Sequence, residues 1–284
     1  MHALGDRTRR AQTGRHPCPF AASTGFRVPL PFALGTFGVA GRLLRARAWV
    51  AGANRWRFTK DPPGAPRRPE RMERASASLE LIRRGATALG LELGEEQLQN
   101  LERHLILLGK WNKVINLTAI TSPEEMVEKH IIDSLAVAKL VPRGTLLDAG
   151  SGAGFPGVPI RVARPDVEVI LVDSVQKKVA FLKNLLAELR LGNIRAQAVR
   201  LGGDPPAEGL PRVQGAVARA FAAPASWLRL AEPYVLPGGL VLCMLGPRDD
   251  VVPNQGALTL ERDLAYNLPF SGAQRRVLLY RRRP

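Results

Sequence analysis

The sequence has 284 residues, a formal net charge of +16 and 45% hydrophobic residues, which predicts one domain of ordinary size with an additional segment. No run of eighteen apolar residues occurs, which argues against a membrane-spanning helix. The two cysteines, Cys18 and Cys243, suggest neither a disulfide framework nor a metal site, and they fit a reducing compartment such as the cytoplasm.

Most of the positive charge lies in residues 1–71. This segment holds 14 Lys and Arg against three acids, a net charge of +11, which leaves +5 for the rest of the chain. It also has eight prolines and no sustained hydrophobic period, so it cannot bury enough apolar surface to offset its ordering entropy. We expect a disordered basic extension. A start codon placed before the true start at Met72, a nucleic-acid-binding arm and a transit peptide all stay open as its origin.

A small helical subdomain is predicted over residues 72–142. Apolar residues recur at helical spacing over residues 79–89 and again over residues 98–108. The segment Gly109–Leu117 breaks this period, which predicts the end of the second helix.

A third helix of this subdomain is predicted to begin after Ser122. Ser122, Pro123 and Glu125 have the spacing of a capping box with proline at the first helical position. The helix should run to about Leu140. Its inward residues are expected to be Val127, Ile131, Leu135 and Ala138.

The stretch Thr145–Asp173 organises the remaining residues, 143–284. A short buried strand ends at Asp148, and Gly150, Gly152 and Gly154 follow at alternate positions. A turn of this kind carries no side chains where a ligand lies against the backbone. A helix and a second apolar strand complete the unit, and the strand ends in an acid at the carboxyl edge, where open α/β sheets bind ligands. The pattern predicts a nucleotide half-site with a carboxylate for ribose hydroxyls.

The glycine turn favours one nucleotide class over another. Gly152–Gly157 matches the G-x-G-x-x-G fingerprint of dinucleotide-binding proteins. Asp148 and Gly150 extend it to D-x-G-x-G, the signature of S-adenosylmethionine methyltransferases, and Pro156 falls where the turn enters its helix. Methyl transfer is therefore favoured over nicotinamide or flavin binding.

Strands and helices continue to alternate after Asp173. This alternation predicts a doubly wound α/β fold. The expected elements are a helix over 179–189 stopped by Gly192, strands over 194–199, 215–219 and 240–245, a helix over 227–234, and an antiparallel pair over 259–264 and 276–280.

Four motifs carry a resemblance to a known family: Trp111–Ile120, Glu128–Leu135, Leu146–Pro159 and Val217–Ala222. In this order and spacing they resemble the ribosomal RNA small subunit methyltransferase G family, also called glucose-inhibited division protein B. The resemblance implies a Rossmann-like class I methyltransferase with an N-terminal helical part. It also implies methyl transfer from S-adenosylmethionine to N7 of a guanine in small-subunit ribosomal RNA, by a monomer without a metal.

The resemblance also implies the site residues. Arg219 would be catalytic and would contact the cofactor or the guanine. It follows an apolar strand, at the edge where Asp148 and Asp173 are expected, and such a charge is costly unless it meets a ligand or a carboxylate. The implied cofactor-binding residues are Gly150, Gly152 and Phe155 at the turn, Asp173 at the ribose, Leu201 and Gly202 at the adenine, and Arg219.

Two positions depart from the family's pattern. Gly202 stands where the family usually has a glutamate, although Asp204 lies nearby, and Leu245 stands where it usually has a lysine. A non-catalytic RNA-binding protein that retains the fold is therefore an alternative, and a nicotinamide-dependent oxidoreductase is a second one.

The chemistry implied by the resemblance needs few catalytic groups. Guanine N7 has a free lone pair and no proton to remove, so alignment matters more than a general base. His130 and Asp133 share one helical face, and helix packing and a role in the site both stay open for them. Asn112 and Asn116 flank a turn and are expected to bond to their local backbone, and the resemblance leaves a substrate or interdomain role open for them. Trp227 is expected in the core.

Overall fold

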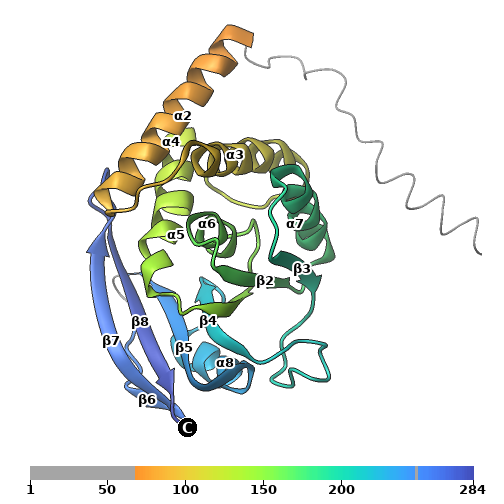
Figure 1. Ribbon diagram of the computed structural model, residues 1–284, viewed down its shortest axis with the longest axis vertical. Helices are drawn as coiled ribbons and strands as arrows, with labels where there is room; N and C mark the ends of the chain where they lie inside the picture. The colour runs from red at the N-terminus through yellow and green to blue at the C-terminus, as the bar shows by residue number, and fades with distance from the viewer. Residues whose placement is uncertain (1–67, 247–248) are drawn as a thin grey trace, which may run out of the picture. The chain divides into compact units, whose positions relative to one another are not determined.

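The computed structural model describes residues 68–246 and 249–284 (Figure 1). The expectations for residues 1–67 and for their origin lie outside the described residues. The first described helix begins at Arg68, so the expected boundary at residue 71 falls within its first turn.

The described helices precede and alternate with the strands. They are α2 (Arg68–Ala88), α3 (Glu95–Ile115), α4 (Pro123–Met126), the π-helix η1 (Val127–Ile132), α5 (Asp133–Ala136), the 3-10 helix η2 (Ala138–Leu140), α6 (Gly157–Ala163), α7 (Gln176–Leu189), α8 (Pro224–Ala231) and the 3-10 helix η3 (Glu232–Tyr234).

The described strands form one sheet in the order β3-β2-β1-β4-β5-β8-β7-β6. They are β1 (Gly144–Ala149), β2 (Val167–Asp173), β3 (Ile194–Ala198), β4 (Val213–Arg219), β5 (Val235–Leu245), β6 (Asn254–Gln255), β7 (Leu258–Asn267) and β8 (Gln274–Arg282). The first five are parallel, whereas β8 pairs antiparallel with β5 and with β7. This confirms the predicted α/β class, the order of its elements and the final antiparallel pair.

Apolar residues cover both faces of the sheet, as the unbroken apolar runs of the strands predict. Leu146 faces a core formed with α2, α3, α5, α6 and α7, whereas its neighbour Leu147 faces a second core built around α8. Trp227 of α8 is buried in that second core, as predicted. Helices therefore flank the sheet on two sides and leave its carboxyl edge available for ligands.

One predicted helix end is wrong. The second helix does not stop at Gly109. Trp111, in the next turn, packs against the core and lies 5.7 Å from the Phe181 ring, so α3 continues to Ile115. The backbone of Asn116 is left-handed and ends the helix there. The predicted end of the helix over 179–189 is confirmed, because α7 ends at Leu189, although the left-handed residue that follows is Arg190 rather than Gly192.

The third predicted helix is present and contains an unexpected π turn. Ser122 caps its start by accepting a hydrogen bond from the Glu125 N–H, and Pro123 occupies the first turn, as predicted. The four residues expected to face inward are all buried. The π-helical segment Val127–Ile132 inserts into an otherwise regular helix, a distortion that often marks a functional site.

The helical segment packs directly on the sheet domain. Helix α3 contacts α6 and α7, and Ala65–Pro284 forms one compact unit. The division at residues 142 and 143 into a helical subdomain and a methyltransferase domain stays a prediction.

Candidate active site

Two adjoining cavities lie at the carboxyl edge of the parallel strands. The first cavity, about 440 Å³, is lined by the glycine turn, by Arg219 and by residues of the third helix and the β7–β8 hairpin. The second cavity, about 450 Å³, is lined by Asp173 and by the segments that follow β2 and β3. Gly150 and Ala220 line both, so the cavities meet at the ends of β1 and β4.

The glycine turn is shaped by positive φ angles and by close packing. Gly150, Gly152 and Gly154 have φ angles of +67°, +54° and +91°, a region that disfavours other residues. A Cβ atom at Gly150 would lie 2.4 Å from the Phe221 ring. At Gly150 and Gly152 the turn therefore presents backbone, not side chains, to the cavities.

Asp148 supports this turn from the protein interior. It is fully buried, and its Oδ2 accepts a hydrogen bond of 2.9 Å from the Gly157 N–H. Burial raises the pKa of this carboxyl to about 7, against the lowering effect of its hydrogen bonds. Asp148 is absent from the lining of both cavities, so its role is to hold the turn and the start of α6.

Asp173 lies on the wall of the second cavity. Its oxygens accept hydrogen bonds from the Gly152 N–H at 3.0 Å and the Val175 N–H at 2.8 Å. Each carboxylate oxygen keeps further acceptor capacity. Val175 and Phe221, both about two-fifths exposed, add apolar surface to the same cavity, as does Leu201. An acid beside apolar side chains fits a ribose and a flat base.

Gly202 lies outside the lining of both cavities. Its N–H donates to Glu208 Oε1 at 2.7 Å, and Glu208 also accepts from the Tyr234 hydroxyl at 2.6 Å. Asp204 does not take the place of the family's glutamate in a cavity, because its Oδ1 accepts from the Ala207 N–H of its own turn. Glu208 thus orders the loop in which Gly202 stands.

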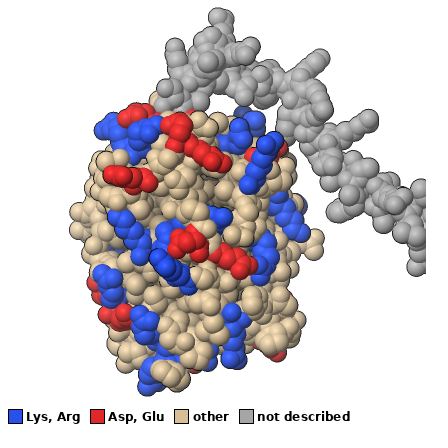
Figure 2. Space-filling model, in the orientation of Figure 1, with Lys and Arg blue, Asp and Glu red and all other residues tan. Residues whose placement is uncertain are grey.

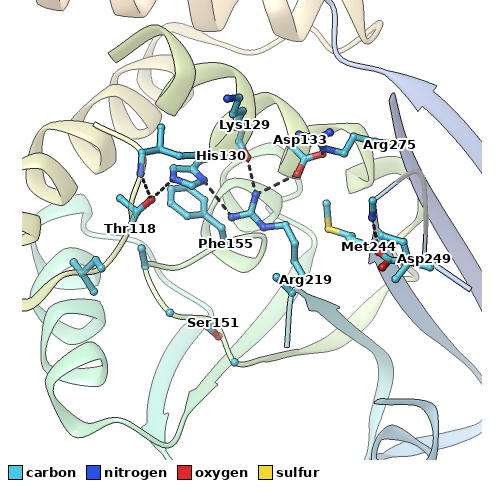
Figure 3. Close-up of a pocket in the computed structure, with 18 of the residues that line it drawn as sticks. Thr118, Lys129, His130, Asp133, Ser151, Phe155, Arg219, Met244, Asp249 and Arg275 are labelled. Atoms are coloured by element: carbon cyan, nitrogen blue, oxygen red, sulfur yellow. Dashed lines mark hydrogen bonds and ion pairs between the residues drawn. The ribbon is translucent and has the colours of Figure 1, made fainter. Parts of the chain in front are cut away.

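Arg219 is the centre of the first cavity (Figure 3). Its Nη1 donates to the Lys129 carbonyl at 2.7 Å and to Asp133 Oδ2 at 3.1 Å, and its Nη2 donates to His130 Nδ1 at 3.3 Å. The guanidinium also lies 5.5 Å from the Phe155 ring centroid. The expectation that Arg219 faces Asp148 or Asp173 is therefore wrong: the carboxylate that it contacts is Asp133, from a helix distant in sequence.

Asp133 joins Arg219 to the β7–β8 hairpin. Its Oδ1 accepts a hydrogen bond of 2.9 Å from the Tyr266 hydroxyl and lies 3.6 Å from Arg275 Nε. The Asp133 side chain is 5% exposed, and three donor side chains from three different strands compensate its charge. Burial and the Asp133 charge both raise the pKa of Tyr266, which keeps this phenol protonated.

His130 is held as a neutral ring. Burial, followed by the Arg219 charge, lowers its pKa to about 3. Because a guanidinium can only donate, Nδ1 accepts and the ring proton lies on Nε2, which donates to Thr118 Oγ1 at 3.0 Å. That oxygen also accepts the Ile120 N–H at 3.1 Å. Both acceptor sites of Thr118 are filled, and its own proton is available to a ligand.

The structure places most of the predicted site residues on the cavities. Gly152, Phe155 and Arg219 line the first cavity, Asp173 and Leu201 the second, Gly150 both, and Gly202 neither.

Three residues of the first cavity, Thr118, Tyr266 and Arg275, were missed by sequence reasoning. Thr118 lies within the first of the four motifs, which could have indicated it. Asn112, which bonds both the N–H and the carbonyl of Thr118, confirms its expected backbone role. Tyr266 and Arg275 carry no local signal, because a hairpin distant in sequence brings them to the site.

Charge on the surface is mixed. On the face shown in Figure 2, Lys and Arg side chains are spread widely and interspersed with Asp and Glu. Leu245, where the family's lysine is missing, contributes apolar surface to the first cavity. Among the residues that the structure describes, no helix is long and apolar enough to cross a membrane, and no cluster of His, Cys, Asp or Glu could hold a metal.

The fold and the site together define a class of protein. Five parallel strands in the order β3-β2-β1-β4-β5, an antiparallel β8 beside β5, a glycine turn after β1 and an acid at the end of β2 make up the Rossmann-like class I methyltransferase fold.

Comparison with known proteins identifies the family. Residues 97–279 match the family model for rRNA small subunit methyltransferase G. The ribosomal RNA small subunit methyltransferase G of Myxococcus xanthus is 47% identical over 204 residues, covering 69% of this chain and 93% of that protein. The protein of that name from Anaeromyxobacter sp. strain Fw109-5 is 44% identical and covers 71% and 96%. The chain belongs to the rRNA small subunit methyltransferase G family.

Among solved structures, a methyltransferase from Pyrococcus furiosus aligns with a TM-score of 0.46 and 16% identity. The alignment covers 64% of this chain and 97% of that one.

Proposed function

We propose that the protein transfers a methyl group from S-adenosylmethionine to N7 of a guanine in small-subunit ribosomal RNA. One observation carries the proposal: in a chain of this family, the second cavity, with a carboxylate and apolar side chains, meets the first cavity at Gly150 and Ala220. The first cavity has a charged wall formed by Asp133, Arg219 and Arg275. A cofactor and an acceptor base bound on either side of this junction would bring their reacting atoms together.

The residues present fit S-adenosylmethionine. Asp173 would accept hydrogen bonds from the ribose hydroxyls, and Val175, Leu201 and Phe221 would enclose the adenine with apolar surface. The turn at Gly150 and Gly152 leaves space for the methionine end against the backbone, since neither residue has a Cβ atom. Gly202 would act from behind the cavity by fixing the loop of Leu201.

The first cavity offers suitable donors for guanine. Guanine carries an acceptor, O6, beside N7, whereas adenine carries an amine donor at the same position. The Thr118 hydroxyl proton and the N–H groups of Arg219 that bond no described residue are available to such an acceptor. Donors on this wall favour guanine over adenine at the acceptor position.

The proposed mechanism uses alignment, not proton transfer. When bound, S-adenosylmethionine supplies an electrophilic methyl group on a sulfonium. His130 is neutral, but its nitrogens are engaged by Arg219 and Thr118, so neither is available as a base. Guanine N7 has no proton to lose, which makes a base unnecessary. Arg219 is anchored at three points and would hold the base at the junction without rearrangement, as preorganised sites do.

Two measurements test this proposal. Isothermal titration should give binding of S-adenosylmethionine and none of NAD. Mass mapping of small-subunit ribosomal RNA from cells with and without the protein should reveal one 7-methylguanine that depends on it. Binding of NAD alone would support an oxidoreductase, and identical RNA from the two cell lines would support a non-catalytic RNA-binding protein.

A further inference from the structure

A second histidine, His104, lies fully buried beneath the glycine turn. It occupies the same face of α3 as Leu101 and Leu108, so it fills a core position in an apolar helical stripe. Its Nε2 lies 2.7 Å from the carbonyl oxygen of Ala153, 49 residues along the chain. Because a carbonyl only accepts, the ring proton lies on Nε2 and donates to the turn.

His104 is also part of a stack of three rings. Its ring lies parallel to that of Phe155, with centroids 4.5 Å apart and an interplanar angle of 11°. On Phe155 a second ring, that of His130, stacks at 4.7 Å and 16°. His130 in turn bonds to Arg219. The stack therefore connects α3, the glycine turn and the charged wall of the first cavity.

The other nitrogen of His104 has no partner. Nδ1 is buried and bonds to no described atom. An unpaired buried polar atom costs stability, so an apolar ring would serve better if this position only filled the core. What histidine provides here, and an apolar ring would not, is the Nε2–H group that donates to the Ala153 carbonyl.

The turn is held at two adjacent residues. Asp173 accepts from the Gly152 N–H on one side, and His104 donates to the Ala153 carbonyl on the other. Ala153 and Gly152 both line the first cavity. These two bonds fix the orientation of the peptide groups against which a ligand would lie.

We propose that His104 is a positioning residue that preorganises the glycine turn for the cofactor, through its hydrogen bond to Ala153 and its stacking on Phe155. This inference rests on the proposed function, because it assigns the turn to S-adenosylmethionine. A turn that must be ordered during binding gives a weaker complex than one already in place. His104 should therefore affect cofactor affinity more than turnover.

Two substitutions separate the hydrogen bond from the packing. His104→Phe keeps a stacking ring but has no donor, whereas His104→Gln places an amide N–H where Nε2 lies. The matched control is Leu101→Ala, one turn earlier on the same buried face of α3. For each full-length variant, S-adenosylmethionine binding is measured by titration, kcat and KM are measured on small subunits, and the melting temperature is recorded.

His104→Phe is expected to raise the Kd and KM for S-adenosylmethionine about tenfold, with kcat within about twofold of wild type. His104→Gln should restore affinity to within roughly threefold of wild type, as retention of the bond requires. Leu101→Ala should lower the melting temperature and leave KM unchanged. If His104→Phe does not fold, His104→Asn replaces it, because its shorter amide cannot reach the Ala153 oxygen.

Two results would overturn the inference: wild-type affinity in His104→Phe, or an equal loss of affinity in Leu101→Ala. A wild-type protein that binds no S-adenosylmethionine would refute the proposed function and the inference together. Normal wild-type binding with a normal His104→Phe variant would refute the inference alone.

Discussion

The two sides of the candidate site are built in different ways. The side formed by the glycine turn and Asp173 comes from one continuous stretch. The bonds of Asp148 and Asp173 join carboxylates to backbone N–H groups at most 21 residues away, and only the bond from His104 spans as many as 49 residues. The opposite side comes from segments far apart in the sequence. Arg219 meets Asp133 across 86 residues, and Tyr266 meets Asp133 across 133.

This difference indicates which side tolerates change. Backbone groups of a turn are held by main-chain geometry, so a single side-chain substitution leaves most of their arrangement intact. The charged wall depends on side chains that compensate one another in a buried place, where removal of one partner leaves another uncompensated. We therefore expect substitutions on the charged wall to have the larger effects.

Replacement of Arg219 should have the largest effect. Arg219→Ala removes the donor at the junction of the cavities and should lower kcat at least about a hundredfold, as loss of a preorganised donor does. Tyr266 and Arg275 still contact Asp133, so the far-ultraviolet circular dichroism should stay close to that of wild type. Arg219→Lys is the control that keeps the charge but not the forked geometry. Wild-type turnover in Arg219→Ala would remove this residue from the site.

Replacement of Asp173 should act on cofactor affinity. Asp173→Ala removes the proposed acceptor for the ribose hydroxyls, and a charged hydrogen bond contributes about 1.5–3 kcal/mol. The Kd for S-adenosylmethionine should therefore rise roughly tenfold or more. Asp173→Asn retains one acceptor oxygen for the Gly152 N–H, so its Kd should lie between those of wild type and Asp173→Ala. Unchanged affinity in Asp173→Ala would contradict the ribose assignment.

Two glycine substitutions should change the free energy of unfolding in opposite directions. In Gly150→Ala the new Cβ would lie 2.4 Å from the Phe221 ring, at a φ of +67° that alone costs about 1 kcal/mol. In Gly109→Ala the new Cβ lies inside α3 with nothing within 4 Å, so it should stabilise the protein by about 1 kcal/mol. Urea unfolding measures both, and cofactor titration should detect a loss in the first variant only. Equal stability of the two would contradict the packing described at the turn.

Acidification should have the smallest effect, a gradual change in the stability of the protein. Burial lowers the pKa of His104 to about 4, from an ordinary value of 6.5. Between these values the unfolded histidine binds a proton that the folded one does not, so this contribution to stability is lost as pH falls toward 4. The buried Asp148, with its pKa raised to about 7, acts in the opposite sense and loses its contribution as pH rises.

Comparison with a variant isolates the histidine. The melting temperature of wild type minus that of His104→Phe should decrease between pH 6.5 and pH 4, because Asp148 contributes equally to both proteins. A difference that does not change with pH would show that His104 titrates normally in the folded state.

The extent to which sequence anticipates this site follows from the same comparison. The glycine spacing and the acid that ends β2 predicted the turn and its carboxylate, because their geometry is set within 29 contiguous residues from Thr145 to Asp173. The predicted carboxylate partner of Arg219 was wrong, because no local pattern encodes its contact with Asp133, which lies on a helix 86 residues away. Likewise, His104 is hidden in an apolar helical stripe, and only tertiary packing shows that its ring meets the turn.

The most direct test of the account is the identity of the methylated product. Full-length protein is incubated with labelled S-adenosylmethionine and with small ribosomal subunits from cells that lack the protein. The RNA is then digested to nucleosides. We predict that the label appears in 7-methylguanosine alone with wild type and is lost with Arg219→Ala. Label in a methylated amine or a ribose, or equal labelling by the two proteins, would contradict the account.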